Sequence, residues 1–312
     1  MIPKKYLQRI ESFLTTKDKE QVIKGYMNER VCAFRVNILK TTAGEVESFL
    51  CTSNIPFDKP VFPALSYVIE KKYEFTLKGS TLFYEGKIYL QGLASQIPAN
   101  ILDLKSNMNV LDVTAAPGSK TTQMSALMNN EWRIIACEKH QIRYDKLVYN
   151  IKLQGATNIE THKIDALKLM SQINPETFDA ILLDAPCSAE GRFKLSDEKS
   201  YGFWTLRNIR EKAMIQTMLL EACMPLLKKW WVLVYSTCTL APEENEAVVS
   251  NVIAQHPDFK LEKIEIGNLQ YAIPWIQSFD GRVYNDAIEN TIRILPSHLT
   301  EGFYLAKIRK DW

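Results

Sequence analysis

The sequence predicts an α/β fold with a doubly wound parallel sheet, preceded by a small α+β unit. From about residue 109 onward, apolar runs rich in β-forming residues alternate with segments long enough to form helices. Their nearly continuous hydrophobicity is typical of strands buried on both faces of a parallel sheet, and the segments between them suit crossover helices. This hydrophobicity marks NVLDV at 109–113, RIIACE at 133–138, DAILLDA at 179–185 and WVLVYST at 231–237. In chain order NIETHKI at 158–164 is the probable third run, and GFYLAKI at 302–308 is the last.

The first hundred residues have a different pattern. Apolar side chains recur at near-helical spacing at the start of the chain and then alternate with polar ones, as in a strand with one buried face. We therefore predict two units, a small one over residues 1–88 and a large one over 89–312. The elements expected in the small unit are a helix within residues 3–28, a strand at 34–38, a helix near 45–50 and short extended segments at 67–77 and 82–90, the last turning at Glu85-Gly86.

Composition indicates a folded chain and excludes bulk binding to a polyanion. Hydrophobic residues make up 46% and charged residues 24% of the 312 residues, which excludes a disordered chain or a short disulfide-stapled module. With 38 basic and 36 acidic side chains the net charge is only +2, so any contact with nucleic acid must be local. Residues 1–100 contain 14 basic and 10 acidic side chains, so the surplus lies in the N-terminal third.

The six cysteines indicate a reducing compartment. They are widely spaced and include no C-x-x-C pair, so the sequence suggests neither a zinc site nor a disulfide framework, and we expect no metal. The N-terminus lacks the apolar run of a signal peptide, and no segment approaches the ~20 apolar residues of a membrane span. We expect a cytoplasmic protein without a membrane partner.

In an open α/β sheet, ligands bind beyond the carboxyl ends of the strands. The first run is followed by TAAPGSKT at 114–121, whose small side chains let a ligand approach the backbone. The loop matches neither the P-loop nor the G-x-G-x-x-G pattern, which leaves open a nucleoside ligand without phosphates. Glu138 and Asp165 follow the second and third runs. Each acid alone could be a solvated carboxylate or a helix cap, but together they favour an adenosine site.

Two cysteines follow strands that should be neighbours in the sheet. Cys187 lies in DAPCS after the fourth run and Cys238 lies in STCT after the fifth. A reactive thiol needs partial exposure and surroundings that favour the thiolate, which a ligand cleft beside helix N-termini supplies. We therefore interpret these two as functional thiols. The other four, Cys32, Cys51, Cys137 and Cys223, are interpreted as inert packing residues.

These motifs resemble the Sun/Fmu family of S-adenosylmethionine-dependent RNA (cytosine-5) methyltransferases. Their order and spacing agree with that family, and the resemblance covers most of the chain. It implies a Rossmann-like class I methyltransferase domain, with an RNA-binding role for the small N-terminal unit. The segments that carry it are RVNILK at 35–40, LQGLASQIPA at 90–99, DVTAAPGSKT at 112–121, LLDAPCS at 182–188, VYSTCTLAPEENE at 234–246 and RILPSHLTEGFYLAKIRK at 293–310.

The resemblance also implies a role for each catalytic residue. C5 of cytosine is a poor nucleophile, so a thiolate must first attack C6, and the family assigns this attack to the cysteine that is Cys238 here. Cys187 would assist the β-elimination that releases the product. Asp184 would hydrogen-bond the N3/N4 edge of the base, with a raised pKa if it donates a proton there. Lys120 would contact the target cytosine.

The implied cofactor is S-adenosylmethionine, and the implied partner is RNA. We favour ribosomal RNA, with transfer RNA as the alternative, and expect the target base to be single-stranded or flipped out of its stack. Aromatic side chains after Cys187 are candidates to stack on it, although packing is an equal explanation. These are Phe193, Tyr201, Phe203 and Trp204. The implied cofactor-binding residues are Ala115, Ala116, Pro117, Gly118, Lys120, Glu138, Arg143, Asp165 and Asp184.

Two departures from the family pattern and two competing functions remain open. Trp230-Trp231 stands where the family has a glycine pair, and residues 188–191 read Ser-Ala-Glu-Gly where small residues are usual. A DNA cytosine-5 methyltransferase would use Cys187 as its nucleophile, but the second thiol disfavours it. An RNA-binding assembly factor without turnover is the non-enzymatic alternative. We expect a monomer with no RNA-binding domain appended after the last strand.

Overall fold

The computed structural model describes residues 2–267, 269 and 271–311, which form a small sheet, a large sheet and the two-stranded pair of β12 (Ser278–Phe279) and β13 (Arg282–Val283). The small sheet has the order β2-β3-β1-β4, and all its pairings are antiparallel. Its strands and helices enclose a core of their own around Phe34, Leu50 and Tyr67. The elements are β1 (Cys32–Val36), α3 (Ala43–Thr52), β2 (Phe57–Asp58), β3 (Ser66–Ile69), η1 (Lys71–Tyr73), α4 (Glu74–Lys78), α5 (Thr81–Tyr84) and β4 (Ile88–Leu90).

Two details of the small unit differ from the sequence prediction. Residues 74–77 and 82–84, expected to be extended, lie in the helices α4 and α5. Glu74 pairs with Lys71 and Lys78 at helical spacing, and Gly79-Ser80 separates the two helices. The helical run at the start of the chain is two helices, α1 (Lys4–Glu11) and α2 (Thr16–Met27), because Thr15 caps the second by accepting from Asp18 N at 3.2 Å.

The large sheet confirms the predicted doubly wound fold. Its order is β11-β14-β15-β9-β8-β5-β6-β7, and all six predicted runs are strands of it. The five strands from β7 to β9 are parallel, whereas β15 is antiparallel to β9, so the sheet is mixed. The strands are β5 (Asn109–Asp112), β6 (Arg133–Cys137), β7 (Ile159–His162), β8 (Phe178–Asp184), β9 (Leu227–Thr237), β10 (Phe259–Glu262), β11 (Ala272–Ile273), β14 (Ile292–Ile294) and β15 (Phe303–Lys310).

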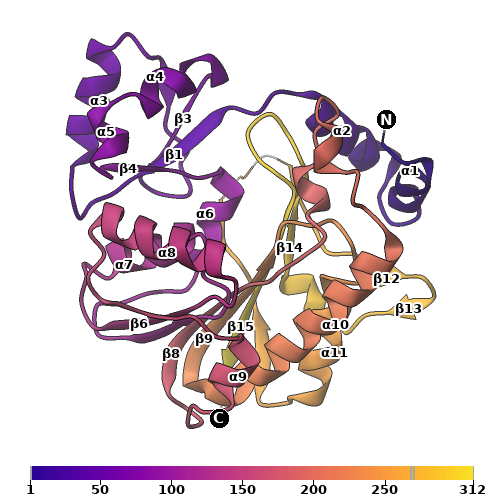
Figure 1. The fold of residues 1–312 in the computed structure, drawn as a ribbon. Coiled ribbons are helices and arrows are strands. Elements are labelled where there is room, and N and C mark those ends of the chain that lie inside the picture. The colour runs from indigo at the N-terminus through magenta and orange to yellow at the C-terminus, as the bar shows by residue number, and fades with distance from the viewer. Residues whose placement is uncertain (1, 268, 270, 312) are drawn as a thin grey trace.

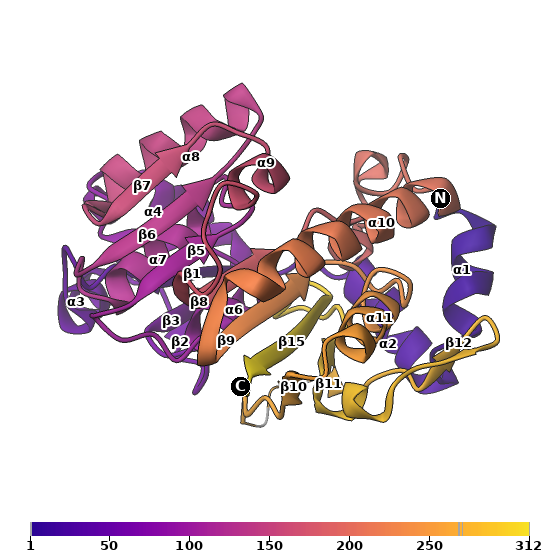
Figure 2. The same cartoon turned by 90° about the horizontal axis from the view of Figure 1, so that it is seen from below.

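Helices cover both faces of this sheet (Figures 1 and 2). On one face α6 (Leu93–Asn100) and α7 (Ser119–Leu127) pack on Val110 and Leu182, and α8 (Gln141–Gln154) packs beside α7. On the other face α9 (Ala166–Met170), α10 (Leu206–Cys223) and α11 (Glu246–Gln255) pack on neighbouring side chains of the same strands. The remaining elements are η2 (Glu190–Arg192), η3 (Glu198–Ser200), η4 (Met224–Leu226), β12 (Ser278–Phe279), β13 (Arg282–Val283) and η5 (Asp286–Asn290).

The strand order changes direction at β5, which pairs with β6 on one side and β8 on the other. This switch point is where a doubly wound sheet leaves room for a ligand. Figure 1 shows the small sheet and the α1–α2 pair on opposite sides of the upper end of the large sheet. The carboxyl ends of the parallel strands therefore lie between two N-terminal segments.

The helices α1 and α2 pack on the large unit. Tyr6, Ile10 and Tyr26 are buried in one cluster with Phe193 and Trp204. Most buried apolar residues of 32–88, by contrast, form the separate small core, while Ala33 and Val68 pack on Leu93 of the large unit. The division at residues 88 and 89 stays a prediction.

The tryptophan pair has two different environments. Trp230 has a φ of 71° and is 63% exposed, so the backbone here adopts the left-handed conformation that glycine favours. Trp231 is half-buried and packs against the cores on both faces of the sheet. The first indole is thus added apolar surface and the second is packed core.

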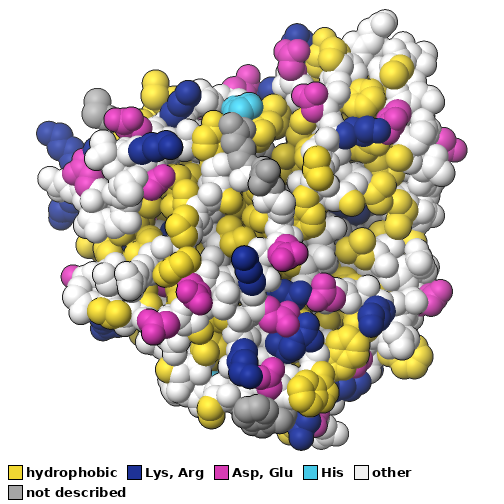
Figure 3. All heavy atoms as spheres, turned by 180° about the vertical axis from the view of Figure 1, so that it is seen from behind, with side chains coloured by type: hydrophobic (Ala, Val, Ile, Leu, Met, Phe, Trp, Pro, Cys, Tyr) yellow, Lys and Arg dark blue, Asp and Glu magenta, His cyan; other side chains and the backbone are white. Residues whose placement is uncertain are grey.

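The distribution of surface charge and the length of the helices can be compared with the expectations of local charge and of no membrane span. On the face in Figure 3, Lys and Arg side chains lie interspersed with Asp and Glu. None of the helices that the structure describes has the length and apolar content needed to cross a membrane.

Two glycine-to-alanine variants test the packing of α2. A Cβ on Gly25 would lie 2.2 Å from the carbonyl oxygen of Pro296, so Gly25→Ala should lower the free energy of unfolding by about 1–3 kcal/mol. Gly44 in α3 is the control, because a Cβ there would lie 4.0 Å from its nearest neighbour, the hydroxyl of Thr42. Gly44→Ala should raise the free energy of unfolding by about 0.5–1 kcal/mol. Urea denaturation measures both, and equal effects would contradict this packing.

Candidate active site

The paired strands β8 and β9 bring two thiols together. The strands are parallel neighbours, with Asp184 opposite Ser236, and each cysteine follows the end of its strand. The Sγ atoms of Cys187 and Cys238 lie 3.3 Å apart. Both residues are half-buried, and both thiols are free. The sulfurs therefore lie on the same side of the sheet, in residues that are only partly buried.

Backbone contacts hold the two cysteine loops together. Gly191 N donates to the carbonyl of Cys238 at 3.0 Å, and the Ser188 hydroxyl lies 2.7 Å from that of Thr239. Gly302 N in turn donates to the carbonyl of Gly191 at 2.8 Å. A Cβ on Gly191 would lie 2.1 Å from the carbonyl oxygen of Gly302, so only glycine at position 191 lets the two backbones lie this close.

The two thiols differ in proton affinity. The pKa of Cys238 is lowered chiefly because Cys187 donates a hydrogen bond to it, and the charge of Arg192 lowers it further against the effect of burial. The pKa of Cys187 is raised well above its ordinary value by the same hydrogen bond and by burial. Of the two thiols, Cys238 therefore loses its proton more readily, with Cys187 as the hydrogen-bond donor. Only a thiolate is a strong nucleophile.

Arg192 was missed by the sequence analysis. It ends the short helix η2, one residue after Gly191, and the nearby Cys238 raises the pKa of its guanidinium. A lone arginine five residues after the first cysteine has no distinctive spacing. Its importance follows only from the fold of the loop around the sulfurs.

A carboxylate and an ammonium group lie at the same edge. Lys120 Nζ is 2.7 Å from Asp184 Oδ2 and 2.8 Å from the Ser95 hydroxyl. The other carboxylate oxygen of Asp184 accepts from the Ser236 hydroxyl at 2.8 Å. Both oxygens of Asp184 thus accept hydrogen bonds, which orients it to accept a further N–H. Ser95 and Ser236 are contacts that sequence reasoning missed.

The loop between β5 and α7 is held by α8. Arg143 Nη2 donates to the carbonyl of Ala116 at 2.7 Å, and Asn150 Nδ2 donates to that of Pro117 at 2.8 Å. Gly118 has a φ of 102°, and a Cβ there would lie 3.0 Å from Leu147. The small residues of this loop therefore place its backbone against α8. Ala115 belongs to the same buried cluster as Leu147.

Glu138 lies at the carboxyl end of β6, and its side chain is 4% exposed. One oxygen accepts from His140 N at 2.9 Å, and the other lies 3.2 Å from Arg143 Nε. Each carboxylate oxygen can accept two hydrogen bonds, so capacity remains for a ligand hydroxyl. Asp165 caps α9 by accepting from Leu167 N at 3.1 Å and lies 3.3 Å from Lys139.

The small sheet reaches this loop through a buried cation. Arg35 on β1 is 3% exposed, the hydrogen-bond acceptors that the structure records for it are neutral oxygens, and its guanidinium lies 5.0 Å from the centre of the Tyr89 ring. Nε donates to Gln91 at 3.0 Å, and Nη2 donates to the Thr122 hydroxyl at 2.7 Å and the Ser119 carbonyl at 3.2 Å. Burial lowers the pKa of Arg35 to about 10. The first turn of α7, which carries Lys120, is thereby fixed from the N-terminal side.

Three of the four proposed stacking aromatics are core residues, and that expectation is wrong for them. Phe193, Tyr201 and Trp204 are at most 7% exposed. The rings of Phe193 and Trp204 lie 5.2 and 5.4 Å from the ring of Tyr6 on α1. Helix α1 packs over this loop and buries the three side chains. The sequence around them does not reveal a contact with a helix at the start of the chain. Phe203 is 51% exposed and remains available to a ligand.

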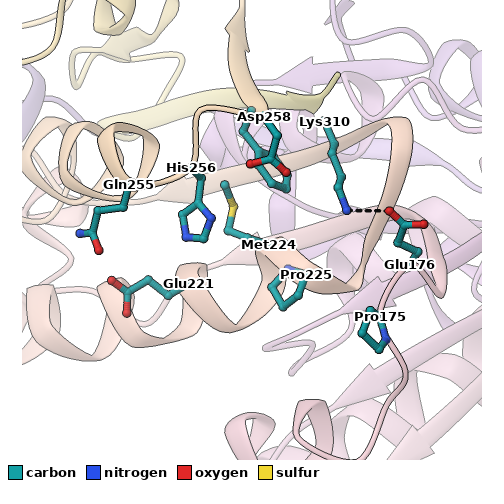
Figure 4. Close-up of a pocket in the computed structure, with 10 residues that line it drawn as sticks. Pro175, Glu176, Glu221, Met224, Pro225, Gln255, His256, Asp258 and Lys310 are labelled. Atoms are coloured by element: carbon teal, nitrogen blue, oxygen red, sulfur yellow. Dashed lines mark hydrogen bonds and ion pairs between the residues drawn. The ribbon is translucent and has the colours of Figure 1, made fainter. Parts of the chain in front are cut away.

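A separate surface pocket of about 630 Å³ lies at the amino ends of the parallel strands, away from the two cysteines (Figure 4). It is bordered by Glu176 just before β8, Pro225 just before β9 and Lys310 at the end of β15. Lys310 is bonded to Glu176 at 3.0 Å and to the carbonyl of Leu227 at 3.1 Å. None of the predicted site residues borders it. In the part of the chain that the structure describes, no group of His, Cys, Asp and Glu could hold a metal ion.

Fold and site together define a Rossmann-like class I methyltransferase with a thiol pair at the carboxyl edge of its sheet. Residues 99–309 match the family model described as 16S rRNA methyltransferase RsmB/F. The chain belongs to this family, which confirms the resemblance drawn from the motifs.

Curated relatives act on different RNAs. Ribosomal RNA small subunit methyltransferase F of Aeromonas salmonicida is 35% identical over 284 residues, which cover 89% of this chain and 57% of that protein. The tRNA (cytosine(49)-C(5))-methyltransferase of Pyrococcus abyssi is 36% identical over 282 residues, covering 89% of this chain and 88% of that protein. The chain thus spans little more than half of the first relative.

A solved structure shows the same architecture. The crystal structure of a methyltransferase homologue from Pyrococcus horikoshii superposes with a TM-score of 0.85 and 28% sequence identity. The match covers 99% of this chain and 95% of that one. Both the small sheet and the large sheet are therefore part of the shared fold.

The family uses S-adenosylmethionine, and the residues of this chain fit that group. Glu138 is a buried carboxylate with unused acceptor capacity on the strand beside β5, as recognition of ribose hydroxyls requires. The loop at the switch point carries Ala115 and Ala116, whose small side chains let a ligand approach the backbone.

Replacing Arg192 with a neutral residue should raise the pKa of Cys238. In Arg192→Gln the loss of a nearby positive charge raises the pKa of Cys238, so alkylation of that thiol by iodoacetamide should shift to higher pH. Arg192→Lys should largely retain the wild-type profile. Peptide mass spectrometry across a pH series measures each cysteine separately.

Lys194→Gln is the matched control, because Lys194 is an exposed cation of the same loop. It should leave the alkylation profile of Cys238 unchanged. An equal shift in both glutamine variants would show that general surface charge, and not Arg192, sets the pKa.

Proposed function

We propose that this chain is an S-adenosylmethionine-dependent RNA (cytosine-5-)-methyltransferase that works through a covalent bond between Cys238 and C6 of cytosine. The observation that carries the proposal is the pair of sulfurs 3.3 Å apart, in which the pKa of Cys238 is lowered and that of Cys187 is raised by their hydrogen bond. The printed names of relatives that act on cytosine C5 in ribosomal and transfer RNA support it.

The covalent step begins with Cys238. Its thiolate adds to C6 of the target cytosine, which breaks the conjugation of the ring and makes C5 an enamine-like nucleophile. S-adenosylmethionine, when bound, supplies an electrophilic methyl group. The loop between β5 and α7 and the carboxylate of Glu138 hold that cofactor, so much of the catalysis is positioning.

Product release needs the second thiol. After methylation, C5 loses its proton and the bond between Cys238 and C6 breaks, which restores both the aromatic ring and the thiolate. Cys187 assists this β-elimination because its sulfur lies beside that of Cys238. The pair therefore divides the work between attack and release.

Asp184 and Lys120 hold the base. Asp184 accepts hydrogen bonds from Lys120 and Ser236, and its remaining acceptor capacity suits the N4 amino group of cytosine. Lys120 is 6% exposed and is fixed between Asp184 and Ser95, so its ammonium lies ready to contact the pyrimidine ring. Both residues thus orient the edge of the base toward the two sulfurs.

The RNA substrate is proposed to be ribosomal RNA, with transfer RNA as the alternative that the Pyrococcus relative supports. The small N-terminal unit is proposed as an RNA-binding unit of a monomeric cytoplasmic enzyme. Bisulfite mapping of 5-methylcytosine in RNA from cells that lack the gene decides between the two RNAs. If no cytosine loses its methyl group, the reading as an assembly factor without turnover is favoured instead.

Two cysteine variants separate attack from release. Cys187→Ala should accumulate a covalent protein–RNA adduct, because addition proceeds while β-elimination is impaired. Cys238→Ala should form no adduct, because the nucleophile is gone. Denaturing electrophoresis and mass spectrometry detect the adduct, and Cys223→Ala, at a buried thiol outside the site, is the control. An adduct found only in Cys238→Ala would reverse the roles.

Glu138→Gln should weaken cofactor binding. Hydrogen bonds to a charged group contribute about 1.5–3 kcal/mol, so the Kd for S-adenosylmethionine should rise about tenfold or more. Calorimetry measures it without any RNA. Glu131→Gln, an exposed acid before β6, serves as control and should bind as the wild type does. Equal affinities in all three proteins would remove Glu138 from the cofactor site.

A further inference from the structure

A buried carboxyl group holds the loop of Cys187 from behind. Glu244 follows β9 and is 0% exposed. Its Oε2 accepts from Ser188 N at 3.0 Å and from Gln216 Nε2 at 2.8 Å. The same amide nitrogen of Gln216 donates to the carbonyl of Pro186 at 2.9 Å. The residues on either side of Cys187 are therefore tied to this pair of side chains.

Three buried oxygen atoms around Glu244 lack a donor. Glu244 Oε1, Gln216 Oε1 and Glu190 Oε2 are shielded from solvent and make no hydrogen bond. Exchanging the ends of the Gln216 amide would not help, because its nitrogen already serves two acceptors. A protonated carboxyl supplies one donor to such a set of acceptors, which a carboxylate cannot do.

The charges around the site place that proton on Glu244. The titratable groups that face it are Cys187 and Glu190 from the loop after β8 and Tyr235 from β9, all of them neutral or acidic. Burial raises the pKa of Glu190 as well, but the charge of Arg9 and the hydrogen bond from Trp204 Nε1 at 2.7 Å oppose that rise. Burial raises the pKa of Glu244 to about 8.

We propose that Glu244 is a neutral carboxylic acid in the working enzyme, and that its proton positions the loop of Cys187 beside Cys238. Glu244 is a positioning residue that acts through Ser188 and Gln216. The inference rests on the proposed function only for its consequence in catalysis. The protonation state itself is a property of the folded chain.

The proton has a defined effect with pH. The pKa of Glu244 is higher in the folded chain than in the unfolded one, so its contribution to stability is present at low pH. That contribution is lost as pH rises toward about 8. Above this pH a bare charge faces Cys187 and Glu190, and the loop that carries Cys187 loses its fixed position.

Infrared spectroscopy and a glutamine variant test the protonation directly. A protonated carboxyl has a carbonyl stretch that an ionised one lacks, and glutamine mimics the neutral acid in shape and hydrogen bonding. The difference spectrum of the wild type and Glu244→Gln should contain this band at neutral pH, and it should vanish as pH passes about 8. Absence of the band at neutral pH would overturn the proposal.

Activity tests the positioning role. Glu244→Gln should retain methyl transfer within about threefold at neutral pH and lack the alkaline decline that the wild type owes to this group. Glu244→Ala should lose about tenfold or more in kcat, because Ser188 N loses its acceptor. Glu211→Gln, an exposed acid on α10, is the control and should keep the wild-type pH profile.

The outcomes keep the two proposals apart. If no variant and no wild-type protein methylates any RNA while the infrared band is present, the proposed function fails and the neutral acid stands. If Glu244→Gln loses as much activity as Glu244→Ala, or declines at alkaline pH as the wild type does, the positioning role is overturned.

Discussion

The parallel pairing of β8 with β9 is the constraint on which the site depends. The pairing sets Asp184 opposite Ser236 and starts both cysteine loops at the same edge. Burial raises the pKa of either thiol alone, but the hydrogen bond across 3.3 Å lowers the pKa of Cys238 and raises that of Cys187. A slip of one residue would turn the side chains to the other face. The backbone register therefore sets which groups surround each thiol.

Buried polar groups hold this edge from two sides. Arg35 links the small sheet to the first turn of α7, and Lys120 in that turn bonds to Asp184. On the other face Glu244 ties the loop after β8 to α10. An unpaired buried polar group is costly, so each of these side chains has few alternative positions. The small sheet is accordingly connected, through Arg35, to the start of α7.

The strands were predictable because a strand buried on both faces is apolar along its whole length. The place of both cysteines followed from that pattern, since residues after parallel strands meet at one edge. The same reasoning failed at residues 74–77 and 82–84. There the ion pairs of Glu74 favour one short helix, and Gly79-Ser80 separates it from the next. It also failed for Phe193 and Trp204, because an aromatic side chain that packs on α1 has the same local pattern as one that stacks on a base.

The sequence by itself determined the order of the strands along the chain, the small-residue loop and the kinds of side chain at each strand end. These properties depend on contiguous residues and their hydropathy. Only the tertiary structure decided which thiol has the lower pKa, that the charge of Arg192 acts on Cys238 and that Glu244 lacks a charge partner. A pKa depends on groups that distant segments bring within a few ångströms of one another, and no local pattern encodes those distances.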